Sequence, residues 1–344
     1  MVEALCRETA LQKNFLGNAP VHTIYFGGGT PSLLSVEELH TLLANLRTQF
    51  VVAPDAEITL EANPDDVHMD ILKSWRDVGI NRLSMGIQSF FEEELRWMNR
   101  AHNAGQAHRC IEDAFAAGFS NFSIDLIYGS PLLTDEMWQQ NVDTAVKYGV
   151  PHLSCYALTV EEKTPLHKRI VQQKTPDVES DKQARQFLQL MQWLREAGYE
   201  HYEVSNFAKP GFRSRHNASY WKGIPYLGLG PSAHSFNGDS RQWNIANNQL
   251  YIQAINSGTL PSEIEKLTNI QKLNEYIMIS LRTKEGLDIG HVGKVWGFEK
   301  VENILKEAKH YLENQLLRHI DNRLQLTDEG MLLADGIAAH LFFD

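Results

Sequence analysis

Short apolar runs alternate with helical patterns along the first 205 residues, and this alternation constrains the fold more than any other feature. Alternation of this kind implies parallel strands joined by helical crossovers, as in an open α/β sheet or a barrel. We therefore expect an α/β protein with one large parallel sheet. Its strands are expected at residues 23–26, 57–60, 82–87, 121–128, 152–158 and 200–205.

Helical patterns fill the intervals between the expected strands. Ser35 and Glu38 form the S-x-x-E signature of a capping box, which predicts that a helix starts at residue 35 and runs to about residue 49. Further helices are expected at residues 2–16, 69–78, 91–98, 105–117, 134–148 and 180–196.

Most of the expected strands end in glycine or carry polar residues near their carboxyl ends. Gly27, Gly28 and Gly29 follow the first strand, and without Cβ atoms their N–H groups can turn toward a ligand. The carboxyl ends of parallel strands share one rim, which is the active face of α/β folds. Taken singly, each residue could also be a solvated strand end or a satisfied core group. Together we expect them to form a pocket wall, made of Gly28, Gly29, Thr30, Glu61, Gln88, Asp125 and Ala157.

Residues 206–260 interrupt the alternation and are expected to be an irregular linking segment. Glycine, proline, asparagine and aromatic residues are frequent here, and long irregular segments in compact proteins are usually functional. The segment contains the run Arg-His-Asn-Ala-Ser-Tyr-Trp. An imidazole can bind haem iron and aromatic rings can cover a porphyrin, so a haem site is one interpretation of His216, Asn217, Tyr220 and Trp221. A hydrogen-bonded loop histidine is the other.

Residues 261–344 have a different pattern, with three helices, a hairpin and a last helix. This order predicts a small α+β domain that resembles a winged helix. Residues 263–344 contain 10 Lys and Arg against 14 Asp and Glu, and the whole chain has a net charge of −11. Phosphate binding needs a basic surface, so the sequence argues against nucleic acid as a partner.

The cysteines indicate whether the chain has a metal site or disulfides, and the apolar runs indicate its cellular compartment. Cys6, Cys110 and Cys155 are the three cysteines, and their spacing fits neither a metal motif nor a disulfide framework. We expect each to be a buried small residue. There is no apolar run long enough for a membrane span and no pattern typical of a signal peptide. We therefore expect a cytoplasmic protein.

Seven short segments, read in order, resemble the radical-SAM coproporphyrinogen-oxidase-like family. They are GGGTPS, LEANP, NRLSMGIQSF, NRAHN, SIDLIYGSP, CYALTVEEKTP and GLGPSAHSF. The resemblance extends over essentially the whole chain and implies a partial (β/α)₆ barrel, S-adenosylmethionine and a 4Fe-4S cluster. The implied division is a barrel at 1–205, the linking segment at 206–260 and the family's C-terminal domain at 261–344. The run RHNASYW resembles the H-N-x-x-Y-W signature of the haem-chaperone branch.

The resemblance also implies roles for particular residues, none of them catalytic. Gly28, Gly29 and Thr30 would contact the methionine end of S-adenosylmethionine. The nucleoside and carboxylate side would be lined by Glu61, Gln88, Arg100, Asp125 and Ala157. His216 would be the haem ligand. The C-terminal domain would close over the site or serve transfer to a haem-acceptor protein, for example one at a membrane.

One departure from the family pattern concerns the cluster. The family binds it through C-x-x-x-C-x-x-C after the first barrel strand, and this sequence contains neither that run nor that strand. We expect the sequence to be shortened at its N-terminus, with a true loss of the cluster as the alternative. The expected function is a haem chaperone without turnover. The alternatives are an oxygen-independent coproporphyrinogen III oxidase of porphyrin biosynthesis and a degenerate binding module.

Overall fold

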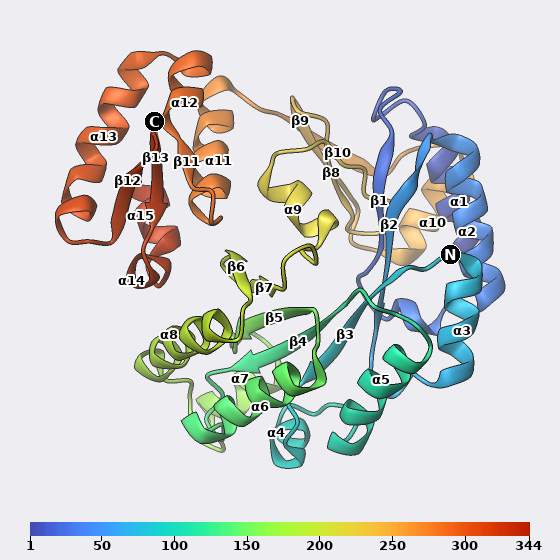
Figure 1. The fold of residues 1–344 in the computed structure, drawn as a ribbon. Coiled ribbons are helices and arrows are strands. Elements are labelled where there is room, and N and C mark those ends of the chain that lie inside the picture. The colour runs from blue at the N-terminus through green and yellow to red at the C-terminus, as the bar shows by residue number, and fades with distance from the viewer.

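The computed structural model describes all residues from 1 to 344, and its largest element is a curled seven-stranded sheet that forms a half-barrel (Figure 1). The strand order is β1-β2-β3-β4-β5-β7-β6, and β1 to β5 are parallel. The expected α/β fold is therefore confirmed. The strands are β1 Val21–Phe26, β2 Val52–Ala62, β3 Arg82–Gln88, β4 Phe122–Tyr128, β5 His152–Ala157, β6 Glu200–Glu203 and β7 Asn206–Ala208.

Helices cover the outer, convex face of this sheet (Figure 1). The expected capping box at Ser35 and Glu38 is confirmed, since both of its hydrogen bonds are present. The first helix ends at Leu11, earlier than expected. The helices are α1 Val2–Leu11, α2 Val36–Gln49, α3 Met69–Val78, α4 Glu92–Trp97, α5 Ala104–Ala116, α6 Asp135–Tyr148, α7 Pro165–Val171 and α8 Ser180–Glu196, with the 3₁₀ turn η1 at Pro31–Leu33.

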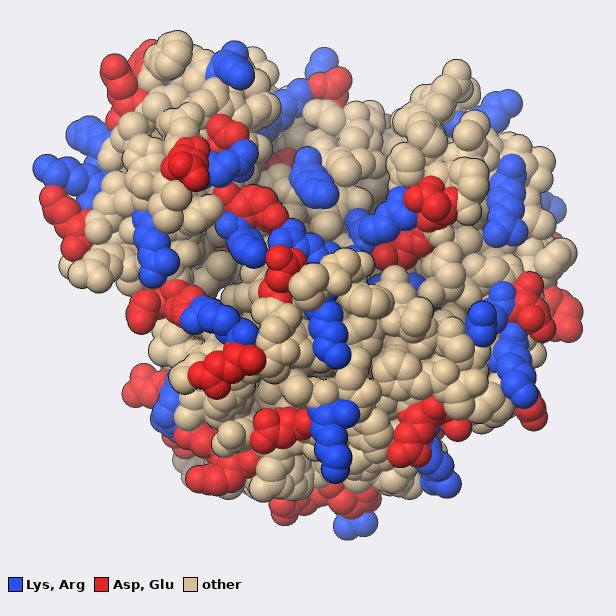
Figure 2. Space-filling view, in the orientation of Figure 1, with Lys and Arg blue, Asp and Glu red and all other residues tan.

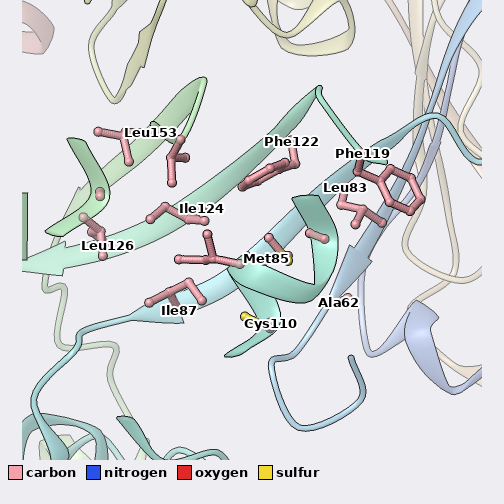
Figure 3. Close-up of a cluster of buried hydrophobic side chains, with 14 of the residues drawn as sticks. Ala62, Leu83, Met85, Ile87, Cys110, Phe119, Phe122, Ile124, Leu126 and Leu153 are labelled. Carbon is pink, nitrogen blue, oxygen red and sulfur yellow. The ribbon is translucent and has the colours of Figure 1, made fainter. Parts of the chain in front are cut away.

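The two faces of the strands differ in chemistry. Alternate residues such as Leu83, Met85 and Ile87 of β3 point outward into a core of 38 buried residues, shared with α2, α3, α5, α6 and α8 (Figure 3). Because successive side chains of a strand point to opposite faces, Arg82 and Ser84 of the same strand point inward. The inner face is polar on β1, β2 and β4 as well. The half-barrel therefore has an apolar outside that is packed and a polar inside that is available for a site.

The last expected strand, at residues 200–205, runs in the same direction as β5, but an antiparallel strand that was not expected, β7, lies between the two. β6 and β7 are a short antiparallel hairpin, and β7 lies antiparallel to β5. Only Val204 and Ser205 separate the two strands, whereas a parallel crossover needs a dozen residues or more. The strand at residues 200–205 therefore closes the series as a hairpin.

The segment expected to be irregular contains several short elements. Helix α9, Arg215–Trp221, carries the whole RHNASYW run and lies at the open side of the half-barrel (Figure 1). A three-stranded antiparallel sheet follows in the order β10-β9-β8. The elements are β8 His234–Phe236, β9 Ser240–Asn244, α10 Asn248–Asn256 and β10 Ser262–Lys266. The boundaries of the three expected segments stay a prediction.

The C-terminal residues form an α+β unit with its own core of 13 buried residues. The expected hairpin is confirmed as β12 Leu317–Ile320 and β13 Arg323–Leu326. Thr327 caps the following helix, which is split in two. The other elements are α11 Asn269–Leu281, β11 Leu287–Asp288, α12 Ile289–Trp296, α13 Phe298–Glu313, α14 Asp328–Met331 and α15 Ala334–His340. No helix of the chain combines the length and apolar character needed to cross a membrane.

Candidate functional site

The glycine turn after β1 and the end of β2 form one side of the rim. Glu61 accepts a hydrogen bond from the Tyr25 hydroxyl (2.7 Å) and another from the Gly28 backbone N–H (3.1 Å). Gly27 must be a glycine, because a Cβ there would lie 2.5 Å from the Tyr25 ring. Gly28 and Gly29 have φ of +77° and +67°, and no atom lies within 4 Å of where a Cβ would stand. The turn therefore presents open backbone beside a fixed carboxylate.

The carboxyl end of β3 forms the next part of the rim. Gln88 has a φ of +63°, which is unusual for a residue with a side chain. Its amide and the Arg100 guanidinium both lie against Gly86, where a Cβ would be 3.0 and 3.3 Å from them. Arg100 donates to Asn63 Oδ1 (3.1 Å), while its Nε is buried without a partner. The structure thus brings Gln88 and Arg100 together and adds Asn63 to the expected set.

Asp125 and Ala157 occupy the rim at β4 and β5. Asp125 points inward, and burial together with the charge of Glu61 raises the pKa of its carboxyl to about 7. Ala157 ends β5 with its methyl group packed toward the outer core, so only its backbone belongs to the rim. Thr30 lies further out, where it precedes the turn η1.

Below the rim, a buried ion pair fixes the start of α9. Glu57 of β2 accepts hydrogen bonds from the backbone N–H groups of Arg215 (3.1 Å) and His216 (3.0 Å). Arg82 Nε lies 3.9 Å from Glu57, and both side chains are almost fully buried. A buried carboxylate is stable only with such partners. The inner face of the sheet therefore sets the position of the histidine.

His216 is enclosed by three side chains at the open side of the half-barrel. Its ring stacks on Tyr25, with 4.6 Å between ring centres and 16° between planes. Nδ1 lies 3.0 Å from Thr23 Oγ1, and Nε2 lies 3.1 Å from the Tyr220 hydroxyl. Burial, helped by the charge of Arg82, lowers the pKa of His216 to about 4. The imidazole is therefore neutral at physiological pH, as a metal ligand must be.

Two residues of the motif, Trp221 and Asn217, make their contacts away from the histidine. Trp221 lies under the Arg282 guanidinium, which stands 5.5 Å from the ring centre. The Asn217 backbone N–H donates a hydrogen bond to the hydroxyl of Ser214, the N-cap residue of α9. The Asn217 side chain makes no hydrogen bond. Only Tyr220 contacts His216 directly, so the aromatic pair does not form one flat surface.

The cysteines do not supply a metal centre. Cys110 and Cys155 are buried in the outer core, and Cys6 lies half-buried on α1. Burial raises the pKa of the Cys110 thiol to about 12, and the pKa of Cys155 rises as well. A cluster needs thiolates, and no group of three Cys, His, Asp or Glu side chains could bind a metal ion.

Five residues of the site were not predicted from the sequence. One is Asn63 at the rim, and the other four lie on the inner face: Thr23, Tyr25, Glu57 and Arg82. The alternation of polar and apolar residues within β1, β2 and β3 is a signal that could have found them. Their contacts with α9 have no local signal.

Comparison with known proteins gives a consistent set of relatives. The radical SAM superfamily model matches residues 9–145, and the HemN C-terminal domain model matches residues 267–333. The haem chaperone HemW of Mycobacterium tuberculosis is 37% identical over 98% of this chain and 85% of its own length. HemW of Lactococcus lactis is 32% identical over 94% and 85%. The structure of coproporphyrinogen III oxidase (HemN) from Escherichia coli, a radical SAM enzyme, superposes with a TM-score of 0.82 and 25% identity, covering 99% of this chain and 82% of that one.

Proposed function

This chain belongs to the HemW family of radical-SAM proteins, and from that premise we propose that it is a haem chaperone which binds haem through His216. The choice of His216 as the haem ligand is supported by the charge, orientation and position of its imidazole. It is neutral, held in one orientation, and placed on α9 at the open side of the half-barrel. A neutral imidazole that is held in place satisfies the requirements of an axial haem ligand.

The rim residues fit S-adenosylmethionine. The open backbone at Gly28 and Gly29 leaves room for the methionine end, next to the Glu61 carboxylate. The unpartnered buried Nε of Arg100 offers a donor to a carboxylate, and Glu61 and Asp125 offer acceptors to ribose hydroxyls or an ammonium group. S-adenosylmethionine supplies a reducible sulfonium group when it is bound. We propose that Thr30, Gln88 and Ala157 complete its site.

The residues of this chain do not fit the 4Fe-4S cluster that the family implies. The three thiols lie on α1, on α5 and on β5, and the two buried ones are disfavoured as thiolates. We therefore derive no part of haem binding from a cluster. Haem binding through His216 needs only side chains that this chain contains.

We propose that the haem is delivered to an acceptor haem protein, membrane-bound acceptors included. The C-terminal domain is joined to α9 by the contact between Arg282 and Trp221, so it lies beside the proposed ligand (Figure 1). Acidic and basic side chains are interspersed on the face that includes this domain (Figure 2). Three free cysteines favour the reducing cytoplasm as the compartment.

A haem titration tests the proposal. The purified chain is titrated with haemin, and the Soret band is compared between wild type and His216→Ala. We expect a shifted, saturable band in the wild type and at least about tenfold weaker binding in the variant. His234→Ala is the matched control, because this histidine is exposed and its ring stacks on Trp243, outside the proposed site. Equal binding by wild type and His216→Ala would contradict the proposal.

Coproporphyrinogen oxidation is the second candidate, and the superposition on HemN favours it. The two candidates share the half-barrel, so the fold does not separate them. Anaerobic incubation with coproporphyrinogen III, S-adenosylmethionine and a reductant separates them, because the oxidase releases CO₂. We expect no CO₂ above the level of a protein-free control.

A further inference from the structure

Both ring nitrogens of His216 lie within hydrogen-bond distance of a hydroxyl group. Thr23 Oγ1 is 3.0 Å from Nδ1, and the Tyr220 hydroxyl is 3.1 Å from Nε2. A metal ion binds imidazole in the ring plane along a nitrogen lone pair. Stacking with Tyr25 covers one face of the ring but leaves that direction unaffected. Haem iron and a hydroxyl therefore compete for the same position.

The two hydroxyls determine which nitrogen carries the proton. A phenol is a stronger acid than an alcohol and thus the better hydrogen-bond donor. A tyrosine hydroxyl carries its proton at neutral pH, so Tyr220 can act as the donor. Tyr220 O–H then donates to Nε2, and Nδ1–H donates to Thr23 Oγ1. Nε2 is therefore the unprotonated nitrogen, and its lone pair accepts the hydrogen bond from Tyr220.

We propose that Tyr220 caps the Nε2 atom of His216 and must swing away before haem binds, while Thr23 is the positioning residue that keeps Nε2 as the ligating atom. The proposal rests on the proposed function of this site. Under this proposal, Thr23 and Tyr220 have opposite effects on haem affinity. Thr23 supports the ligand, and Tyr220 competes with haem for it.

The surroundings of the two hydroxyls agree with these roles. Tyr220 lies in the last turn of α9 and is 41% exposed, and its other aromatic contact is an edge-on approach to Tyr226 at 4.7 Å. Such a side chain can change rotamer at small cost. Thr23 is half-buried within β1, where the ladder to β2 holds its backbone. A returning Tyr220 hydroxyl would also displace bound haem, which gives the protein a route for release as well as for capture.

Nitrogen-15 NMR of the ligand-free protein tests the proton assignment without haem. The His216 ring should show a protonated Nδ1 and an unprotonated Nε2 at pH 7. His216→Ala identifies the resonances by their loss. A protonated Nε2 would overturn the inference, whatever the haem titration shows.

Haem titration of five variants tests the opposite effects. Tyr220→Phe should bind haem roughly 2- to 10-fold tighter and release it more slowly, because one hydrogen bond no longer competes. Thr23→Val should bind about tenfold more weakly, and Thr23→Ser should restore binding. Tyr226→Phe controls for loss of a neighbouring hydroxyl. Thr59→Val is the matched threonine control, because the Thr59 hydroxyl is buried without a partner on the same sheet face.

The outcomes separate this inference from the proposed function. If His216→Ala binds haem like the wild type, the proposed ligand is wrong. If binding depends on His216 but Tyr220→Phe weakens it, Tyr220 assists the ligand and only the capping role is overturned. If Thr23→Val binds haem like the wild type, the positioning role is overturned.

Discussion

The Arg282 guanidinium lies 5.5 Å from the centre of the Trp221 ring, and this contact joins the C-terminal domain to α9. The same guanidinium pairs with Asp335 on α15. The Arg282 carbonyl accepts a hydrogen bond from the Val204 N–H at the sheet hairpin (3.1 Å). One residue therefore contacts the motif helix, the sheet and the last helix.

Removing this contact should loosen the two domains. We expect Arg282→Gln to lower the free energy of unfolding by about 1–2 kcal/mol, because a cation–π contact and an ion pair are lost together. Limited proteolysis should also cut faster between the domains. Arg195→Gln is the control, since its pair with Asp328 also spans the domains but is exposed, and we expect less than about 0.5 kcal/mol. If urea unfolding shows the same loss of stability for Arg282→Gln and Arg195→Gln, Arg282 has no special role in joining the domains.

Gly27→Ala should damage the glycine turn by collision rather than by backbone strain. The new methyl group would lie 2.5 Å from the Tyr25 ring and 2.9 Å from Glu61, so the hydrogen bond between those residues must shift. We expect a loss of about 1–3 kcal/mol in stability and weaker binding of S-adenosylmethionine in equilibrium dialysis. Gly17→Ala, at φ +61° with open space around it, should leave dialysis unchanged. Undiminished binding by Gly27→Ala would remove the turn from the proposed site.

Asp125 should give the protein a pH-dependent stability between about pH 4 and 7. Burial and Glu61 raise its pKa to about 7, above the ordinary value of 3.8. The folded state therefore binds the proton more tightly than the unfolded state, and this contribution is lost as pH rises toward 7. Asp125→Asn should gain stability relative to wild type over this range, by at most about 4 kcal/mol. Urea unfolding at several pH values measures it, with Asp143→Asn on the exposed face of α6 as control.

Haem binding should be insensitive to pH across the range where a free histidine titrates. The pKa of His216 is lowered to about 4, from 6.5, by burial and then by Arg82. The ring thus stays neutral and able to bind iron down to about pH 5. Haem affinity measured from pH 8 to about 5.5 should change less than about twofold. A midpoint near 6.5 would show that His216 is solvated or is not the ligand.

Anaerobic reconstitution of this chain with iron and sulfide should give no 4Fe-4S absorption. The buried thiols of Cys110 and Cys155 are disfavoured as thiolates, and no metal-binding group of side chains is present. Replacing both cysteines by serine should leave the spectrum unchanged. Stoichiometric iron that is lost in this double variant would contradict the account of the cysteines.

Sequence patterns predicted the elements of the half-barrel well because its strands and helices have strong local signals. The alternation of apolar runs, the capping box at Ser35 and the hairpin around Asp321 all depend on neighbours in the chain. The antiparallel strand β7 was not predicted, since a turn of only two residues places it between β5 and β6. The strand-end residues were predicted as one rim because parallel strands end together.

The position of α9 on the sheet could not be predicted, because the residues that hold this helix are far from it in the sequence. Glu57 binds the backbone of Arg215 across 158 residues. The alternation within β2 can place this carboxylate on the inner face, but no local pattern shows that it binds α9. The same holds for Thr23, which meets His216 only after the chain has folded. The sequence suggested the histidine, and the structure added the residues that orient it.

The opposite chemistry of the two strand faces has a consequence for how this protein can change during evolution. Leu83 and Met85 pack against the helices, whereas Arg82 and Ser84, which alternate with them, face the inside of the half-barrel. Successive positions of one strand thus serve separate purposes. A substitution at an inward-facing position can change what the half-barrel binds while the outward-facing residues keep the core packed.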